Sequence, residues 1–524
     1  MHTSLTKLLS LTLLCVAPAV SWAADDDPIK SAKAPEEIIL DKIDQLQRQV
    51  DELRGELTAL RTSKSAVPQA ALVSASAPST SALAAAPTTP IPAQPAQPQT
   101  APSAAKAEPF AFADFTWLQG NPRTKDSPLD SKVFTGEVRV DVNYTDSLNK
   151  PKDHTIGGSS EIFRSNEVQV TQLGVGGDFH YDNVRGRLMT QFGMYSFTTP
   201  RNDASTARGQ WSLDGAYRYV SEAYGGYHIN KLNGINIDAG IFMSYVGLFG
   251  YYQFDNWAYQ PSYVSSNTPW FFNGLRIQIF PSAKLKIEPW VVNGWQSYGK
   301  FNKAPGVGGQ ILWRPNGNIS LLGNQYWGTD TLGNPDRKRV HTDDSIQVKY
   351  LDRPNQGLSK AAFTVTIDAG CEYGGGVSCS GGNPAKPTQS FLGFMLYNRL
   401  WFHKDLYAFT LGGGAITNPG RYLVLMPPIN GATAFSGTPY FTANPGDPYK
   451  AWDASATFDY MPSQFITFRW EFNHRAANVP YFSGQGGITP PGGDIGPAGS
   501  FIPGWVPDLR KRENRFTIAI LVKM

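Results

Sequence analysis

Charged side chains recur at every second position in several segments of this chain. Glu137 and Arg139 alternate with valines, and Arg469 and Glu471 alternate with aromatic residues. Successive side chains of a strand point to opposite faces, so each such segment would have one charged face and one apolar face. Fixed guanidinium groups along a polar passage attract anions, and carboxylates attract cations. These residue types therefore indicate electrostatic selection of solutes rather than the making or breaking of bonds.

The predicted charged face leaves two interpretations open. Its candidate members are Glu137, Arg139, Asp141, Arg185, Arg187, Asp238, Arg276, Gln278, Lys286, Glu288, Lys349, Arg469, Glu471 and Arg475. One interpretation is an anion-favouring filter built from Arg139, Arg187, Arg276 and Arg469. The other is that these arginines pair with nearby carboxylates, as Arg469 could with Glu471, and only keep the face wet.

No arrangement of residues predicts an enzyme, a cofactor or a metal centre. The chain has no nucleophile elbow, phosphate-binding glycine loop or His-Glu-x-x-His motif. His474 has the opposite strand parity to Glu471 and Arg475, whereas metal ligands must converge on one side. A hydrolase whose Ser and His are scattered along the chain stays open as an alternative. The net charge of +3 gives no reason to expect nucleic acid as a partner.

Residues 1–23 have the features of a secretory signal peptide. Lys7 precedes an apolar run, and Ser21-Trp22-Ala23 fits the small-x-small rule for cleavage. The apolar run is shorter than the roughly 18 residues expected of a membrane-spanning helix. Export leaves two cysteines, Cys371 and Cys379, in a glycine-rich segment. We expect them to form one small disulfide that staples a loop, with a redox or metal pair as the alternative.

The alternating segments fall into about sixteen predicted strands between residues 110 and 524, an all-β pattern. Their approximate ranges are 134–145, 166–182, 184–195, 217–230, 234–247, 269–281, 284–296, 306–314, 319–329, 339–351, 359–370, 389–402, 406–417, 451–462, 464–475 and 513–524. A soluble sheet would bury its apolar face, whereas a transmembrane antiparallel β-barrel turns that face to lipid and the charged face to a wet lumen.

Connection lengths favour the barrel. Short links such as Asp182-Asn183 and Pro462-Ser463 alternate with long ones such as 146–165, 418–450 and 476–512. Outer-membrane barrels have short periplasmic turns, long external loops and an even number of strands. We expect one long loop to fold inward and narrow the pore, with 418–450, 476–512 or the aromatic-rich 248–268 as candidates.

Aromatic side chains lie near the predicted strand ends and favour interfacial girdles. They are Tyr144, Tyr181, Tyr195, Trp270, Trp295, Trp313, Trp401 and Trp452. A sugar-stacking surface inside the pore is the alternative use of these rings.

Three further segments precede the barrel: a short segment at 24–38, a heptad-patterned helix at 39–61 and an Ala/Pro-rich linker at 62–109. The heptads predict an α-helical coiled coil that makes homo-oligomers. Its core residues favour a dimer by rule, whereas porin-like barrels favour a trimer, so both remain open. A second possibility is that the coiled coil contacts peptidoglycan and the barrel serves as an anchor or tether.

Several motifs resemble the β-barrel porin-2 family, the OmpL-like porins. They are Asn418-Pro-Gly-Arg-Tyr-Leu, Ser436-Gly-Thr-Pro-Tyr440, Asn444-Pro-Gly-Asp447 and the run from Phe465 to Arg475. The resemblance implies a Gram-negative outer-membrane porin with passive diffusion of small solutes, and it supplies no catalytic set. We therefore expect a porin in contact with outer-membrane lipid and lipopolysaccharide, with the N-terminal stalk in the periplasm.

Overall fold

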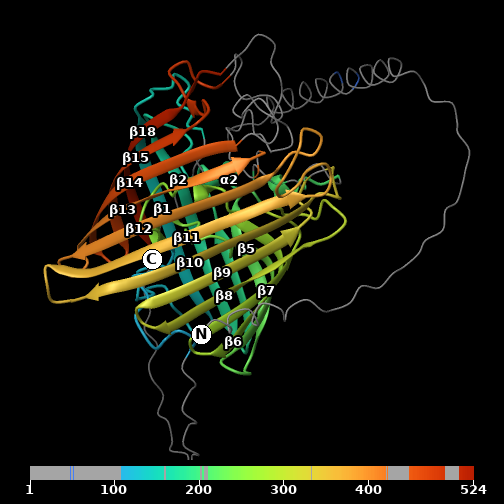
Figure 1. Ribbon diagram of the computed structural model, residues 1–524. Coiled ribbons are helices and arrows are strands. Elements are labelled where there is room, and N and C mark those ends of the chain that lie inside the picture. Colours follow the sequence, from blue (N-terminus) through green and yellow to red (C-terminus); the bar gives the residue numbers. More distant parts are fainter. Residues whose placement is uncertain are drawn as a thin grey trace, which may run out of the picture. The chain divides into compact units, whose positions relative to one another are not determined.

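A computed structural model gives the fold of the protein (Figure 1). It describes residues 48, 51, 108–157, 161–200, 203, 205, 210–331, 333–420, 422, 448–489 and 507–524. The chain divides into two compact units, Met1–Gln99 and Thr100–Met524. The predicted signal peptide, coiled coil and linker lie outside the described residues, except that Arg48 and Asp51 are helical and exposed.

Sixteen antiparallel strands close into one barrel, as the alternation predicted. In chain order they are β1 (Phe134–Ser147), β2 (Val168–Tyr181), β3 (Val184–Thr190), β4 (Val220–Ile229), β5 (Ile235–Met243), β6 (Phe271–Ser282), β7 (Leu285–Val292), β8 (Gly306–Asn316), β9 (Ile319–Gly328), β10 (Lys338–Asp352), β11 (Leu358–Tyr373), β12 (Ser390–Phe402), β13 (Tyr407–Pro419), β14 (Pro448–Ser463), β15 (Ile466–Ala477) and β18 (Arg512–Lys523). Two short strands outside the barrel, β16 (Phe482–Ser483) and β17 (Leu509–Arg510), pair with each other. The first and last barrel strands close the ring, with Arg139 opposite Lys523.

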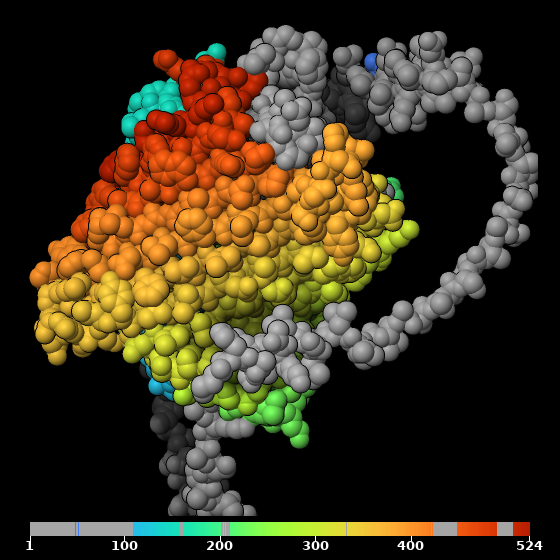
Figure 2. All heavy atoms as spheres, viewed as in Figure 1, coloured from blue at the N-terminus to red at the C-terminus, as the bar shows by residue number. Residues whose placement is uncertain are grey.

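The wall is polar inside and apolar outside. Along β12, Leu392, Phe394 and Leu396 are exposed, while the alternate residues are buried. Along β18, Phe516 and Ile518 are exposed and Arg515 is buried. Figure 2 shows the outer side of this wall over the strands from β8 to β14 as a continuous surface. A soluble protein buries apolar side chains rather than arginines, so this inversion is the pattern of a barrel in lipid.

Connections alternate in length as expected. The turns after the even-numbered strands up to β14 are short, whereas the connections after the odd-numbered strands are longer and carry α2 (Tyr195–Thr198), α3 (Leu213–Tyr217), η3 (Gln253–Asp255) and α4 (Tyr263–Ser266). No helix among the described residues is long and apolar enough to span a membrane. The end with short turns faces the periplasm by the general rule for such barrels.

Several strand predictions were too long, among them 234–247, which ends at Met243, and 284–296, which ends at Val292, and part of the girdle prediction was wrong. The segment 184–195 ends as a strand at Thr190, and 217–230 begins as a strand only at Val220. The chain leaves the wall there for the connection that carries α2 and α3, which begin at Tyr195 and end at Tyr217. Tyr181 and Trp452 are exposed, but Tyr195, Trp295 and Trp401 are buried inside the molecule. Their position near a strand end did not reveal which face they take.

The predicted disulfide between Cys371 and Cys379 is confirmed. It joins the end of β11 to the connection that follows, eight residues further on. The bond staples a loop at the end opposite the short turns, and the redox and metal alternatives are unnecessary.

Candidate functional site

The connection between β5 and β6 folds into the barrel, and we call residues 244–270 the inner loop. Most of its side chains are buried, among them Trp257, Tyr259 and Tyr263. It contacts β1, β14, β15 and β18, which lie across the closed ring from β5 and β6. The candidate loop 248–268 is therefore one that enters the lumen. Residues Tyr481 and Phe482 of the long connection after β15 pack against Tyr263, while 423–447 lie outside the described residues.

Several side chains of β1 contact the inner loop, among them Asn143, which donates to the hydroxyl of Tyr259 at 2.9 Å. Arg139 donates to Asp255 at 3.0 Å and also pairs with Glu137 on its own strand. The hydroxyl of Tyr259 donates to Asp141 at 2.8 Å. The hydrogen-bond partner of Asp141 here is thus a tyrosine of the inner loop rather than one of the arginines that the pairing interpretation considered.

On the opposite strands, backbone groups of the inner loop contact charged side chains. The N–H groups of Tyr259 and Gln260 donate to the two carboxylate oxygens of Glu471 at 2.6 and 2.8 Å. Arg469 donates to the carbonyls of Gln253 and Asn256 at 3.2 and 2.6 Å. Arg469 forms its ion pair with Asp459 at 2.7 Å, so the pairing with Glu471 considered from the sequence is wrong. Charges on the wall therefore position the inner loop.

The other predicted residues lie in ion pairs or against rings of the same lumen. Arg187 contacts Glu137, Asp178 and Glu222 at 2.7–3.1 Å, a four-residue cluster across β1 to β4. Arg185 and Arg276 both contact Asp238, at 3.3 and 3.0 Å. The guanidinium of Arg475 lies 3.9 Å from the ring centroid of Tyr263. Whether these groups line the path of a solute stays a prediction.

A segment before β1 crosses the barrel at its periplasmic end, and we call residues 110–125 the crossing segment. Phe110 donates through its backbone to Ala283 in the turn between β6 and β7, and Trp117 donates through Nε1 to Gly317 in the turn between β8 and β9. On the far side, Arg123 donates to the carbonyl of Ser463 at 2.7 Å, where β14 ends. No periodic pattern marked this segment in the sequence.

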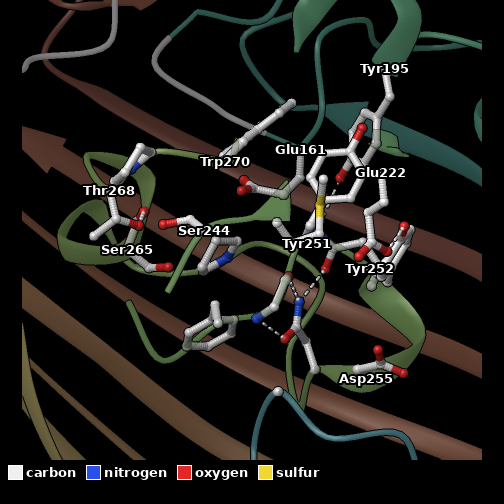
Figure 3. A pocket seen from close by; sticks show the side chains of 18 of the residues that line it. Glu161, Tyr195, Glu222, Ser244, Tyr251, Tyr252, Asp255, Ser265, Thr268 and Trp270 are labelled. Carbon is white, nitrogen blue, oxygen red and sulfur yellow. Dashed lines mark hydrogen bonds between the residues drawn. The ribbon is translucent and has the colours of Figure 1, made fainter. Parts of the chain in front are cut away.

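Two cavities lie on either side of the inner loop. The upper cavity is about 420 Å³ and includes Glu161, Arg187, Glu222, Tyr252 and Asp255 (Figure 3). The periplasmic cavity is about 610 Å³ and includes Arg123, Lys404, Asp459 and Arg469. Asp255 and Asn256 line both cavities, so η3 and the residue that follows it form part of the partition between them.

The partition combines inner-loop and crossing-segment residues. Gln119 donates from Nε2 to Asn256 Oδ1 at 2.9 Å, and the backbone of Trp257 donates to Gln119 Oε1 at 2.6 Å. Sequence reasoning missed Gln119, Asp255 and Asp459. It named 248–268 as a candidate loop without singling out Asp255 within it, and no spacing relates the three residues to one another. Across the described ranges, no group of three or more His, Cys, Asp or Glu residues is placed to hold a metal ion.

The family model described as "Putative beta-barrel porin-2, OmpL-like" matches residues 134–492. The match covers more than half of the chain, and the protein belongs to this family of porins. It is an outer-membrane porin of the Gram-negative type, which agrees with the closed barrel and its apolar outer wall. Among curated proteins, no sequence matches the chain.

Three solved structures align with the chain at low sequence identity. OmpT of Vibrio cholerae in its trimer form is 10% identical, and the alignment covers 75% of this chain and 100% of that chain with a TM-score of 0.42. The high-pH structure of Pseudomonas putida OprB is 10% identical, with 75% of this chain and 94% of that chain covered and a TM-score of 0.42. An anion-selective porin from Comamonas acidovorans is 10% identical, with 75% of this chain and 99% of that chain covered and a TM-score of 0.42. The family assignment rests on the family model and not on these alignments.

Proposed function

We propose that this porin carries small hydrophilic solutes through the two cavities in series and that the periplasmic cavity gives it a weak preference for anions. The observation that carries the proposal is the opposite charge of the two cavities. In both, the charged side chains belong to the lining, where a passing solute would contact them. The predicted filter of Arg139, Arg187, Arg276 and Arg469 is thereby replaced with a more local one.

The periplasmic cavity has an excess of cations among its described lining residues. Its basic members are Arg123, Lys125, Lys360, Arg399, Lys404 and Arg469, and its acidic members are Asp126, Asp255, Asp405 and Asp459. Six positive and four negative charges leave a formal charge of +2, with His403 taken as neutral. Lys404 is exposed in the turn between β12 and β13, where it can attract anions arriving from the periplasm.

The upper cavity has the opposite balance. Arg139 and Arg187 face Glu161, Asp178, Glu222 and Asp255, which leaves a formal charge of −2 among the described lining residues. Both arginines already contact carboxylates, so their charge is largely neutralised locally. A solute crossing both cavities meets fields of opposite sign, and we therefore expect weak overall selectivity rather than a strict anion filter.

The test is single-channel conductance of the refolded full-length mature protein in a planar bilayer with a salt gradient. We expect a steady conductance and a small reversal potential of anionic sign. Lys404→Glu should shift that potential toward cation selectivity. Lys231→Glu is the matched control, because Lys231 is an exposed lysine of another short turn that does not line either cavity.

Arg276→Gln tests the alternative filter. Because Arg276 is paired with Asp238, its replacement should shift the reversal potential less than the Lys404 change does. A larger shift for Arg276→Gln would favour the arginine filter predicted from the sequence. A folded barrel without conductance would contradict the channel itself.

A further inference from the structure

The partition between the two cavities has two parts that are held in different ways. One part is η3 of the inner loop, and the other is the stretch of the crossing segment around Gln119 and Gly120. Gly120 lines the upper cavity, while Leu118 and Asn121 of the same stretch line the periplasmic cavity. The four residues from Leu118 to Asn121 thus lie between one cavity and the other.

The inner loop is held by charged groups of the wall. Arg139, Arg469 and Glu471 bind its side chains or backbone, and Asp453 accepts from Ser262 and from the backbone of Tyr263. These charged groups are nearly inaccessible to solvent. Removing the loop from the wall would leave buried charges unpaired, which is strongly unfavourable.

The crossing segment is held differently. Most of its hydrogen bonds to the barrel and to the inner loop end on backbone carbonyls and neutral side chains, such as Gly317, Ser463 and Gln347. The wall cations that contact it, such as Lys523 on Thr124 and Lys349 over the ring of Trp117, meet neutral groups of the segment. Its ion pair among the described residues, between Lys125 and Asp114, is internal to the segment and exposed to solvent. Detaching the segment would therefore unpair no buried carboxylate of the wall.

We infer that the crossing segment is the movable half of the constriction and that Gln119, Gly120 and Arg123 determine the conductance of the pore. Arg123 has a central position because it binds the turn after β14 and lies 4.9 Å from the ring of Phe254 in η3. When the segment withdraws, the partition loses its Gly120 side and the two cavities join. This inference rests on the proposed route through both cavities.

A substitution at Gly120 should loosen the crossing segment. A Cβ at this position would lie 2.5 Å from the carbonyl oxygen of Leu248, and its φ of +77° is unfavourable for other residues. Gly120→Ala should therefore push the crossing segment away from the inner loop. Gly333→Ala is the matched control, since Gly333 has a φ of +75° but no atom within 4 Å of the added Cβ.

The segment can also be locked in place. A Cβ at Gly317 would lie 2.9 Å from the Cβ of Ala113, so Ala113→Cys with Gly317→Cys needs only a small shift to reach disulfide geometry. The lock fixes the segment to the turn between β8 and β9. Wild-type protein with and without reductant controls for the native Cys371–Cys379 bond.

The experiment measures single-channel conductance and the uptake of sugars of increasing size into liposomes, with full-length protein whose folding is verified by heat-modifiable gel mobility. We expect a severalfold rise in conductance and a larger size limit for Gly120→Ala and for Arg123→Ala, and no change for Gly333→Ala. The oxidised lock should lose the largest openings of the wild type, and reduction should restore them.

The two proposals fail in different ways. If the folded wild type conducts, but both loosening variants and the lock behave like the wild type, the inference about the crossing segment is wrong and the porin proposal stands. If the folded wild type and the loosened variants all fail to conduct, the proposed route is wrong. Should Gly120→Ala fail to fold, Arg123→Ala and the lock decide the matter.

Discussion

Arg139 of β1 and Asp255 of η3 form a buried ion pair of 3.0 Å that joins the barrel wall to the inner loop. The two residues are 116 positions apart in the chain. Arg139 also pairs with Glu137 and stacks 3.9 Å from the ring centroid of Tyr252. The arginine therefore connects the wall charges, the inner loop and the upper cavity, and its first role is to position the constriction.

Replacing Asp255 by Asn should loosen the inner loop without destroying the barrel. Arg139 keeps Glu137 as a partner, so we expect a loss of about 1–3 kcal/mol in the free energy of unfolding. Conductance noise should rise as η3 fluctuates. Asp178→Asn is the control, because Asp178 pairs with Arg187 in the same lumen but is 48% exposed, and it should cost roughly 1 kcal/mol or less. Equal noise in both variants would contradict a positioning role for Asp255.

Two buried arginines inside the barrel share a single carboxylate. Arg399 and Arg469 each contact Asp459 at 2.7 Å, and all three side chains are nearly inaccessible to solvent. Asp459→Asn would leave two buried guanidinium groups without their counter-charge, and we expect a loss of roughly 3–5 kcal/mol, seen as a lower urea midpoint. Asp405→Asn, which breaks the half-buried pair with Lys360 near the periplasmic rim, should cost less, about 1 kcal/mol. A smaller effect at Asp459 than at Asp405 would show that backbone carbonyls alone satisfy the arginines.

Much of the barrel could be predicted from the sequence because its signals are local. Alternation along one strand needs only neighbouring residues, and the lengths of successive connections need only their order. The same reasoning predicted the disulfide, since Cys371 and Cys379 are eight residues apart.

The sequence named 248–268 as one of three loops that could narrow the pore, but the contacts of the constriction could not be predicted because they join residues that are far apart in the chain. Gln119 meets Asn256 across 137 positions, and Arg469 meets the carbonyl of Asn256 across 213. The crossing segment has no periodicity, so nothing in its pattern distinguished it from a linker. Arg469 and Glu471 share a face, as expected. Both side chains hydrogen-bond to the backbone of the inner loop, and this contact was not visible in the sequence.

The disulfide predicts a local effect on stability. The loop between Cys371 and Cys379 is short, so the chain-entropy model assigns the bond a contribution of about 2–3 kcal/mol. Cys371→Ser with Cys379→Ser should therefore speed deuterium exchange in the connection after β11. Conductance should stay unchanged, because the bond is distant from the short-turn end where the crossing segment lies. A changed conductance would instead place this loop on the path of the solute.

A carboxylate between two external loops predicts a response to acid. Asp153 accepts at 2.7 Å from the backbone N–H groups of both Ile488 and Thr489, which belong to the connection after β15. Burial by itself raises the pKa of Asp153, but the hydrogen bonds from Thr489, Ile488 and Thr155 outweigh it and hold the pKa below its ordinary value of 3.8.

The pKa of Asp153 is lower in the folded protein than its ordinary value of 3.8. The contribution of Asp153 to the free energy of unfolding is therefore fully present at a pH above 3.8, and it is lost as the pH falls from 3.8 through the folded pKa. Deuterium exchange of a peptide containing Ile488 and Thr489, corrected for intrinsic rates, should be constant above about pH 5 and should accelerate as the pH is lowered below about 4. Asp153→Asn removes the titrating group, so this step should disappear while exchange is already faster at neutral pH. If Asp153→Asn keeps the acid step, the step belongs to another carboxylate. If the variant leaves protection unchanged at every pH, Asp153 does not hold the two loops together.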